Sequence, residues 1–347
     1  MNLLFRTDAN VAMGTGHVMR CLALAQAWQD ASGSAVFVMA EATSAVEERL
    51  HREGMGMARL QAGPGSADDA QETVALARGK QASWVIVDGY CFGADYQAAL
   101  KEAGLRVLFV DDNGHAGHYS ADLVLNQNVY ANEALYRSRE SSTKILLGPR
   151  HALLRREFAA WRGWKRQIPA IARKVLVTMG GSDPDNVTER VIHAILAEHD
   201  LEATVVVGGS NPHLHKLQEL LGDRPGRVRL VENSTNMPGL LAWADIAVAG
   251  AGTTSLETCF LGLPALLVVL ADNQRPVAEE LSRRGVAIHL GEGAETEANV
   301  LAGYLARLAA SSQIRKTMSQ LGRELVDGQG AERVAARLND KGWDPNE

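Results

Sequence analysis

The sequence predicts an α/β protein made of two doubly wound domains. Short runs of β-branched and aliphatic residues alternate with longer amphipathic stretches, and nearly every short run ends at glycine, asparagine or aspartate. This pattern is typical of parallel strands covered by helices. The chain has 347 residues, which is about twice the length of one domain, and its 46% hydrophobic content is ample for two cores.

We expect the first domain at 1–150, a linker at 151–172 that is rich in arginine and tryptophan, and the second domain with its C-terminal helices at 173–347. Strands are expected at 3–6, 35–39, 84–88, 106–111, 123–126 and 144–147, and then at 174–178, 203–207, 228–231, 246–249, 265–269 and 287–289. Helices are expected at 17–30, 43–54, 67–79, 94–103, 184–198, 213–222, 236–243, 253–261, 273–284 and 295–309, with one or two more after 312. Ligands of such sheets bind beyond the carboxyl ends of the strands, so we expect the two Rossmann-like domains to face a cleft that holds the site.

Charge and cysteine content exclude several classes of protein. The formal net charge of −6 and the interspersed 22% of charged residues provide no basic field for a nucleic acid. Three cysteines, none in a CxxC pair, indicate neither a disulfide framework nor a zinc site. No apolar run approaches the ~20 residues that span a bilayer, and the N-terminus is charged too early for a secretory signal. We therefore expect a cytoplasmic monomer with no nucleic-acid or membrane partner.

A glycine turn after the first expected strand leads into a helix that begins with a histidine. Gly14 and Gly16 allow close backbone approach to a ligand. Met19 stands where a dinucleotide fingerprint needs its third glycine, and no Walker lysine follows, so no cofactor is expected. At the helix start His17 would stay neutral, as a general base must. The alternative is a histidine that only caps the helix or contacts a neighbouring charged side chain.

The motif F-R-x-D at 5–8 followed by G-x-G-H-x-x-R at 14–20 resembles the N-terminus of the pseudaminic acid biosynthesis hydrolases, the PseG family. Those enzymes hydrolyse UDP-2,4-diacetamido-2,4,6-trideoxy-β-L-altrose and are similar to MurG in having the GT-B glycosyltransferase fold. The resemblance continues at 87–90, 110–112, 125–128 and 152–158, and so spans most of the chain.

The resemblance implies that His17 activates water and that strand-end residues surround the sugar. From the residues alone, an aspartate that ends a strand before Gly-Tyr is typical of a site. The expected substrate-binding residues are Arg6, Asp8, Gly14, Gly16, Arg20, Asp88, Tyr90, Asp111, Asn126, Arg155, Asn273 and Gln274. The carboxylates and histidines of 111–118 could also form a metal cluster, but the corresponding loop of the PseG family is not a metal site, and we expect no metal.

Two glycine clusters in the second half predict a nucleotide site. Each follows an expected strand and precedes a helix, so that backbone amides are available to a diphosphate. The expected nucleotide-binding residues are Met179, Gly180, Gly181, Ser182, Gly252, Thr253, Thr254, Ser255 and Glu257. The pattern G-x-G-T-x-x-x-E followed by G-x-P resembles the donor-nucleotide site of MurG-like proteins, where the acidic residue binds ribose. The alternatives are a purely structural turn for the first cluster and a solvent-facing capping carboxylate for Glu257.

Together these features predict a metal-independent hydrolase without a cofactor, which splits the UDP-sugar into UDP and free sugar with inversion. Its expected partners are the UDP-sugar and water. Three other functions use the same residues: a GT-B glycosyltransferase in which a sugar or lipid hydroxyl replaces water, a UDP-sugar 2-epimerase, and a non-catalytic nucleotide-sugar-binding protein. The identity of the sugar rests on the resemblance alone.

Overall fold

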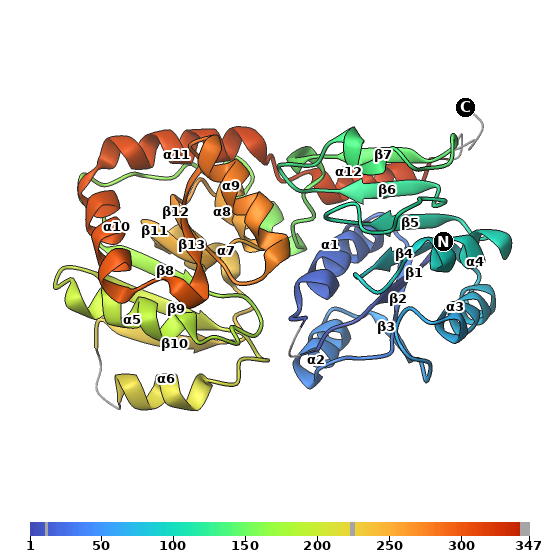
Figure 1. Cartoon of the computed structure of the whole chain (residues 1–347), viewed down its shortest axis with the longest axis horizontal. Coiled ribbons are helices and arrows are strands. Elements are labelled where there is room, and N and C mark those ends of the chain that lie inside the picture. The colour runs from blue at the N-terminus through green and yellow to red at the C-terminus, as the bar shows by residue number, and fades with distance from the viewer. Residues whose placement is uncertain (11–12, 223–225, 341–347) are drawn as a thin grey trace. The chain divides into compact units, whose positions relative to one another are not determined.

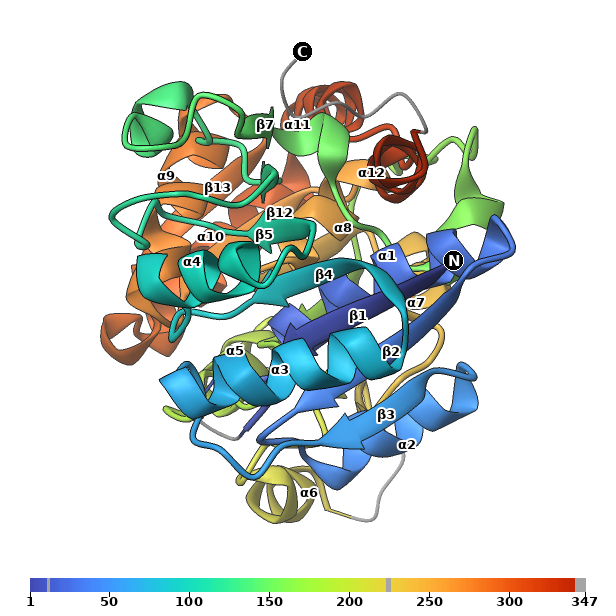
Figure 2. The same cartoon turned by 90° about the vertical axis from the view of Figure 1, so that its right-hand side faces the viewer.

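The computed structural model describes residues 1–10, 13–222 and 226–340, and the chain forms two compact units (Figures 1 and 2). The first unit contains Met1–Asn10, His17–Arg156 and Gly328–Glu347. The second contains Val11–Gly16 and Glu157–Asp327. None of the helices in the described ranges is long and apolar enough to cross a membrane.

A parallel sheet of seven strands, counted over the described residues, forms the first unit in the order β3-β2-β1-β4-β5-β6-β7. The strands are β1 (Asn2–Thr7), β2 (Ser34–Met39), β3 (Gly56–Arg59), β4 (Ala82–Asp88), β5 (Val107–Val110), β6 (Leu123–Asn126) and β7 (Lys144–Leu147). Its helices are α1 (Gly16–Asp30), α2 (Ser44–Arg52), α3 (Ala67–Gly79), α4 (Ala94–Glu102) and α12 (Gly330–Leu338). Successive side chains of β1 point to opposite faces, so Leu3 and Phe5 pack with α1, α2 and α12, while Leu4 packs with α3 and α4.

The second unit repeats this plan with six strands in its described part, in the order β10-β9-β8-β11-β12-β13, all parallel. The strands are β8 (Lys174–Thr178), β9 (Glu202–Val207), β10 (Val228–Glu232), β11 (Ile246–Gly250), β12 (Ala265–Val269) and β13 (Ala287–Glu292). The helices are α5 (Val187–Ala197), α6 (Leu214–Leu221), α7 (Met237–Trp243), α8 (Thr254–Phe260), α9 (Arg275–Arg283), α10 (Ala298–Ala310) and α11 (Ser312–Leu325). Val175, Val205 and Val248 form the core beneath α5, α6 and α10.

The prediction of two doubly wound α/β units is confirmed. Most strands are buried on both faces, as β-branched and aliphatic runs in parallel sheets require. The strand order reverses between β1 and β4 in the first unit and between β8 and β11 in the second. The carboxyl ends of these two strand pairs are therefore where each unit is expected to bind a ligand.

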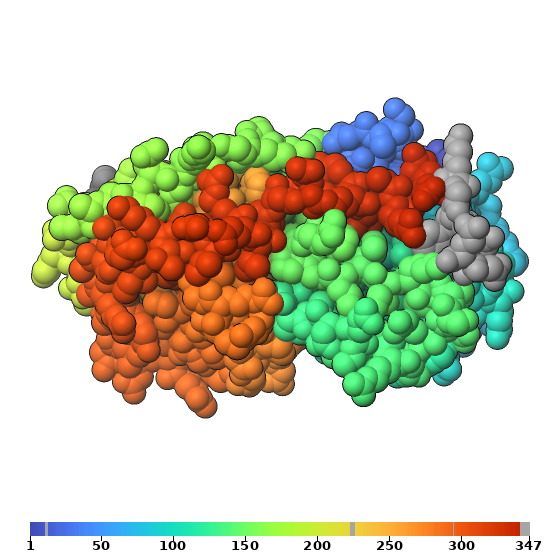
Figure 3. Space-filling model, turned by 90° about the horizontal axis from the view of Figure 1, so that it is seen from above, coloured from blue at the N-terminus to red at the C-terminus, as the bar shows by residue number. Residues whose placement is uncertain are grey.

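Two elements differ from the sequence prediction. Strand β3 was not expected, because it is a four-residue edge strand whose residues are mostly exposed and carry no apolar pattern. Helix α12 lies in the first unit, although we expected all C-terminal helices in the second. Its apolar face, with Val334, Ala335 and Leu338, joins the core of the first unit, and Trp84 Nε1 donates to the Leu338 carbonyl at 3.0 Å. Figure 3 shows this red C-terminal segment beside the green segment near residue 150.

The segment expected as the linker is held by arginines of the second unit. Arg166 donates to the carbonyls of Leu241 (2.7 Å) and Leu261 (3.0 Å), which lie at the ends of α7 and α8. Arg315 Nη2 donates to the Pro169 carbonyl at 3.0 Å. Arg166 thus binds carbonyls at helix ends of the second unit, and Arg315 binds the backbone of the segment itself. Residues 157–172 belong to the second unit rather than to an independent connector.

We predict that Gly330→Ala destabilises the first unit. A Cβ at Gly330 would lie 2.3 Å from the Ala152 carbonyl oxygen and 2.5 Å from its amide nitrogen. Backbone atoms cannot move aside cheaply, so a loss of about 1–3 kcal/mol in unfolding free energy is expected. Urea unfolding measures it. The control is Gly303→Ala in α10, where a Cβ would meet nothing within 4 Å, and where alanine should be neutral or slightly stabilising. Equal stability of the two variants would contradict the α12 packing.

Candidate active site

His17 and Asp88 lie at the carboxyl ends of neighbouring strands in the first unit. His17 is the second residue of α1, which follows β1 and the glycine turn, and Asp88 is the last residue of β4. Gly14 in that turn has φ of +74°, a left-handed conformation that glycine adopts readily. Strands β1 and β4 pair where the strand order reverses, so these side chains occupy the expected ligand position.

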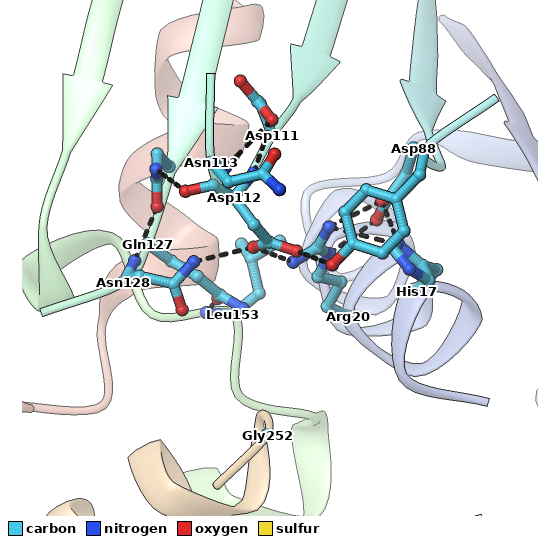
Figure 4. Close-up of polar contacts among 12 residues, drawn as sticks. His17, Arg20, Asp88, Asp111, Asp112, Asn113, Gln127, Asn128, Leu153 and Gly252 are labelled. Atoms are coloured by element: carbon cyan, nitrogen blue, oxygen red, sulfur yellow. Dashed lines mark hydrogen bonds and ion pairs between the residues drawn. The ribbon is translucent and has the colours of Figure 1, made fainter. Parts of the chain in front are cut away.

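A hydrogen-bonded group of His17, Asp88 and Arg20 forms the centre of the site (Figure 4). His17 Nδ1 lies 2.6 Å from Asp88 Oδ1. Arg20 binds the same carboxylate through Nε to Oδ2 and Nη2 to Oδ1, each at 2.7 Å. Arg20 stands three positions after His17, which places both on one face of α1. The helix therefore delivers both side chains to one buried carboxylate.

These contacts determine the tautomer of His17. Arg20 Nη2 also lies 3.2 Å from His17 Nδ1, but a guanidinium can only donate, and the carboxylate can only accept. The shorter contact with Asp88 therefore assigns the Nδ1 proton to that hydrogen bond. Nε2 then carries the lone pair, and it has no hydrogen bond to any residue in the described ranges. This arrangement makes His17 Nε2 a candidate general base.

Asp112 extends the group on the far side of Arg20. Its Oδ1 accepts from Arg20 Nη1 at 2.6 Å and from Asn128 Nδ2 at 2.7 Å. Its Oδ2 accepts from Tyr90 Oη at 2.7 Å. The Tyr90 ring meets the His17 ring edge-on, with centroids 4.9 Å apart and planes at 85°. Asp112 thus connects the loops after β4, β5 and β6 to the helix that carries His17.

The charges of this group are fixed at neutral pH. Burial disfavours every charged form, but the Arg20 guanidinium outweighs it and holds the pKa of Asp88 and of Asp112 below the usual value. Burial likewise opposes the charge of Arg20, yet the two carboxylates raise the pKa of its guanidinium well above the usual value. One cation and two anions leave a net charge of −1 beside His17. That charge stabilises an imidazolium when Nε2 accepts a proton.

Asp111, expected at the sugar, instead shapes the loop that follows β5. It is 1% exposed, and its carboxylate accepts from the backbone amides of 112–114 and from His115 Nδ1 and Tyr119 Oη. Its oxygens are therefore committed to protein donors. His118 of the same loop contacts Ser138 and Glu140 rather than Asp111.

Asn126 is also fully buried, and its side chain holds neighbouring residues of the site in place. Its Nδ2 donates to the Asp112 carbonyl at 2.5 Å and to Tyr136 Oη at 2.8 Å, and its Oδ1 accepts from the Asn128 amide at 3.0 Å. Asn126 thereby fixes Asp112, which binds Arg20, and Asn128, which donates to Asp112. Its side-chain position indicates support of the network rather than direct sugar contact.

Arg6 and Asp8 belong to a different buried group. Arg6 is 0% exposed and binds Asp69 through Nε to Oδ1 (2.9 Å) and Nη2 to Oδ2 (2.7 Å). Its Nη1 lies 2.7 Å from Asp8 Oδ2, and Asp8 Oδ1 accepts the amides of residues 40 and 41. These contacts join β1 to α3 and to the end of β2, so they explain both residues without a ligand.

In the second unit the first glycine cluster precedes a helix whose start is already capped by a carboxylate of the protein. Met179 packs in the core, and Gly180 has φ of +79°. The next carboxylate, Asp183, accepts the Val187 amide at 2.8 Å and the Thr188 amide at 3.0 Å. Because Asp183 caps α5, the start of that helix already has an anion. Gly180, Gly181 and Ser182 precede this capped start.

The second glycine cluster, Gly252 to Ser255, opens α8. Ser255 Oγ donates to the Gly252 carbonyl at 2.7 Å, which shapes the turn. Gln274 lies beside it: a Cβ at Gly252 would be 3.6 Å from Gln274 Nε2, while Gln274 Oε1 accepts the Leu270 amide at 3.1 Å. Glu257 is only 5% exposed, so it does not lie on a solvent face. Asn273 shares the short helix 272–274 with Gln274.

The structure thus brings together His17, Arg20, Asp88 and Tyr90 from the predicted set, while Arg155 lies half-buried after the 149–151 turn. Asp112 and Asn128 were missed. The signal for both was present, since Asp112 directly follows the predicted Asp111 and Asn128 stands two residues after the predicted Asn126, in 110–112 and 125–128. Sequence spacing alone does not show which member of such a pair turns toward the site.

Comparisons with known proteins agree with this architecture. Residues 175–332 match the glycosyltransferase family 28 C-terminal domain. The spore coat polysaccharide biosynthesis protein SpsG of Bacillus subtilis (strain 168) is 30% identical over 240 residues, covering 67% of this chain and 69% of SpsG. The UDP-2,4-diacetamido-2,4,6-trideoxy-beta-L-altropyranose hydrolase of Campylobacter jejuni is 23% identical over 290 residues, covering 83% of this chain and 98% of the hydrolase. The crystal structure of Acinetobacter baumannii MurG aligns with a TM-score of 0.64 at 17% identity, covering 97% and 99% of the two chains.

The two parallel-sheet units therefore have the fold of the GT-B glycosyltransferases, a class of proteins that includes MurG. Within that class, the chain belongs to the family of the B. subtilis protein SpsG.

Proposed function

We propose that this protein hydrolyses a UDP-sugar, with His17 as the general base. The observation that carries the proposal is the 2.6 Å contact between His17 Nδ1 and Asp88 Oδ1, which leaves Nε2 as a proton acceptor. The fixed −1 charge of Asp88, Arg20 and Asp112 would stabilise the imidazolium formed in the reaction. A UDP-sugar is the proposed ligand because the second unit carries the glycosyltransferase family 28 domain.

In the proposed reaction a water oxygen bonds to the anomeric carbon while the bond from that carbon to the UDP oxygen breaks. The bonding electrons leave with UDP, and the water proton passes to His17 Nε2. A single displacement of this kind inverts the anomeric configuration. The first unit supplies the base, and the second unit holds the nucleotide.

The glycine clusters of the second unit are proposed to stabilise the departing UDP. Amides near Gly181 and Gly252 would donate to the diphosphate, and Gln274 beside Gly252 would donate without adding charge. Glu257 is proposed to accept the ribose hydroxyls. UDP leaves as a stable anion that such donors can hold, so we propose turnover without a metal ion.

The C. jejuni relative suggests the sugar to test first, because its name describes a UDP-2,4-diacetamido-2,4,6-trideoxy-beta-L-altropyranose hydrolase. A place in pseudaminic acid biosynthesis would follow from that substrate. The family 28 domain supports a second candidate, a glycosyltransferase in which an acceptor hydroxyl takes the place of water. His17 would perform the same proton transfer in either reaction.

The assay that separates these functions measures UDP release from that UDP-sugar with EDTA present and no acceptor. We expect steady release at a rate unchanged by EDTA, because water is the nucleophile and the chain supplies the donors. UDP binding without release would instead support the transferase. Loss of release on chelation would overturn the metal-independent reaction.

A further inference from the structure

His115 joins two loops of the active site, and both of its ring nitrogens face atoms that only accept hydrogen bonds. Nδ1 lies 2.9 Å from Asp111 Oδ1. Nε2 lies 3.1 Å from the backbone carbonyl oxygen of Phe92. A neutral imidazole has one N–H, so it would leave a lone pair against one of these oxygens. Only the doubly protonated ring satisfies both contacts.

The loop held by the second contact carries Tyr90. Residues 89–92 follow β4, and Tyr90 contacts both His17, edge-on at 4.9 Å, and Asp112, through its hydroxyl at 2.7 Å. The His115 ring also meets the Tyr90 ring edge-on, with centroids 5.7 Å apart. His115 therefore packs against the Tyr90 ring and connects the 89–92 loop to Asp111.

From this geometry we propose that His115 is an imidazolium that positions Tyr90 beside His17 and that its deprotonation releases the 89–92 loop. The inference rests on the proposed function for its catalytic consequence only. His115 is a positioning residue, because it acts through Tyr90 and does not itself contact the reacting atoms.

The surroundings of His115 favour the cation. Its side chain is 18% exposed, and burial opposes the charge, but the hydrogen bond and charge of Asp111 raise its pKa above the usual value. Asp112 adds to that effect, and the other rings packed against it, Phe109 and Tyr90, are uncharged at neutral pH. A raised pKa in the folded state means that the stabilisation is fully present below about pH 6.5 and is lost as the pH rises through the folded-state value.

Nitrogen-detected NMR of ¹⁵N-histidine-labelled protein tests the protonation state directly, with the His115 signals assigned from the His115→Gln spectrum. We expect both ring nitrogens to be protonated at pH 6.5, with a titration midpoint above that pH. A singly protonated ring at pH 6.5 would overturn the proposal, and this readout requires no turnover.

Thermal unfolding and kinetics test the consequence. The Tm difference between the parent protein and His115→Gln should be largest near pH 6 and should shrink toward pH 9. The matched control is His118→Gln, a histidine of the same loop whose side chain is 43% exposed, and this variant should leave kcat/KM of UDP release unchanged. In UDP release we expect kcat/KM of His115→Gln to be about tenfold lower near pH 6.5 and to lack the alkaline decline of the parent protein. An unchanged alkaline decline in His115→Gln would contradict the proposal, whereas absence of release from the parent protein would contradict the proposed function alone.

Discussion

His17→Asn is expected to lower the rate of UDP release by about a thousandfold, which is the middle of the range for loss of a general base. The asparagine amide can still donate to Asp88, so the buried carboxylate keeps a hydrogen-bond partner and the fold should be retained. Nothing at the Nε2 position would then accept a proton. UDP affinity should be unchanged, because we propose that the nucleotide binds the second unit.

Steady-state kinetics and calorimetric titration with UDP measure these two quantities separately. His118→Asn is the matched control, because it removes an imidazole that contacts Ser138 and Glu140 in the same unit. Its rate should equal that of the parent protein. A rate loss of less than about tenfold for His17→Asn would contradict general-base catalysis by His17.

Asp88→Asn is the second large effect, and it should reduce both activity and stability. The Asp88 oxygen next to His17 Nδ1 also accepts from Arg20, and the other oxygen accepts from Arg20 Nε. An amide group must place its NH₂ at one of these positions. Beside His17 it would donate to Nδ1 and move the imidazole proton to Nε2, where the base is lost. At the other position it would meet the Arg20 donor.

We expect Asp88→Asn to lower kcat by about 10³ to 10⁴, the scale of carboxylate-to-amide changes in catalytic His-Asp pairs. It also leaves the buried Arg20 with one carboxylate instead of two, for which a loss of about 3–5 kcal/mol is expected. Asp112→Asn is the matched comparison, since it removes a charge from the same guanidinium but has no contact with His17 Nδ1. It should lose similar stability but only about tenfold in kcat.

Urea unfolding and kinetics of the two folded variants test this separation, and equal losses of kcat would contradict the assignment of Asp88 to the His17 tautomer.

The contribution of Asp88 to folding stability depends on pH with a defined sign. Because the pKa of Asp88 is lowered in the folded state, its stabilisation is present above the unfolded value of about 4 and is lost as the pH falls further. The stability difference between the parent protein and Asp88→Asn should therefore shrink in acid.

The alternation of apolar runs and amphipathic stretches was enough to predict both sheets, because strands buried on both faces leave a strong pattern. The path of the C-terminus was not predictable in this way. Helix α12 has an ordinary amphipathic pattern, and its packing in the first unit depends on Trp84, on the absence of a side chain at Gly330 and on the Ala152 backbone. These contacts join residues far apart in sequence.

In the site, too, local sequence patterns predicted some residues, whereas tertiary contacts determine the positions of others. Gly14, His17 and Asp88 could be found because strand ends and helix starts mark them in the sequence. Of the adjacent pair 111–112, the structure commits the first carboxylate to the loop amides and places the second on Arg20. Likewise Arg6 shares a motif with the site but binds Asp69, which no local signal indicates. Short-range patterns locate strand ends, whereas side-chain direction depends on tertiary partners.

Hydrolysis in ¹⁸O-labelled water tests the central claim most directly. The parent protein is incubated with UDP-2,4-diacetamido-2,4,6-trideoxy-β-L-altropyranose and no acceptor. The masses of both products are then measured by mass spectrometry, before the anomeric oxygen of the free sugar exchanges with water. Attack of a His17-activated water on the anomeric carbon predicts one ¹⁸O in the sugar and none in UDP. Label in UDP would mean attack at phosphorus and would contradict the account.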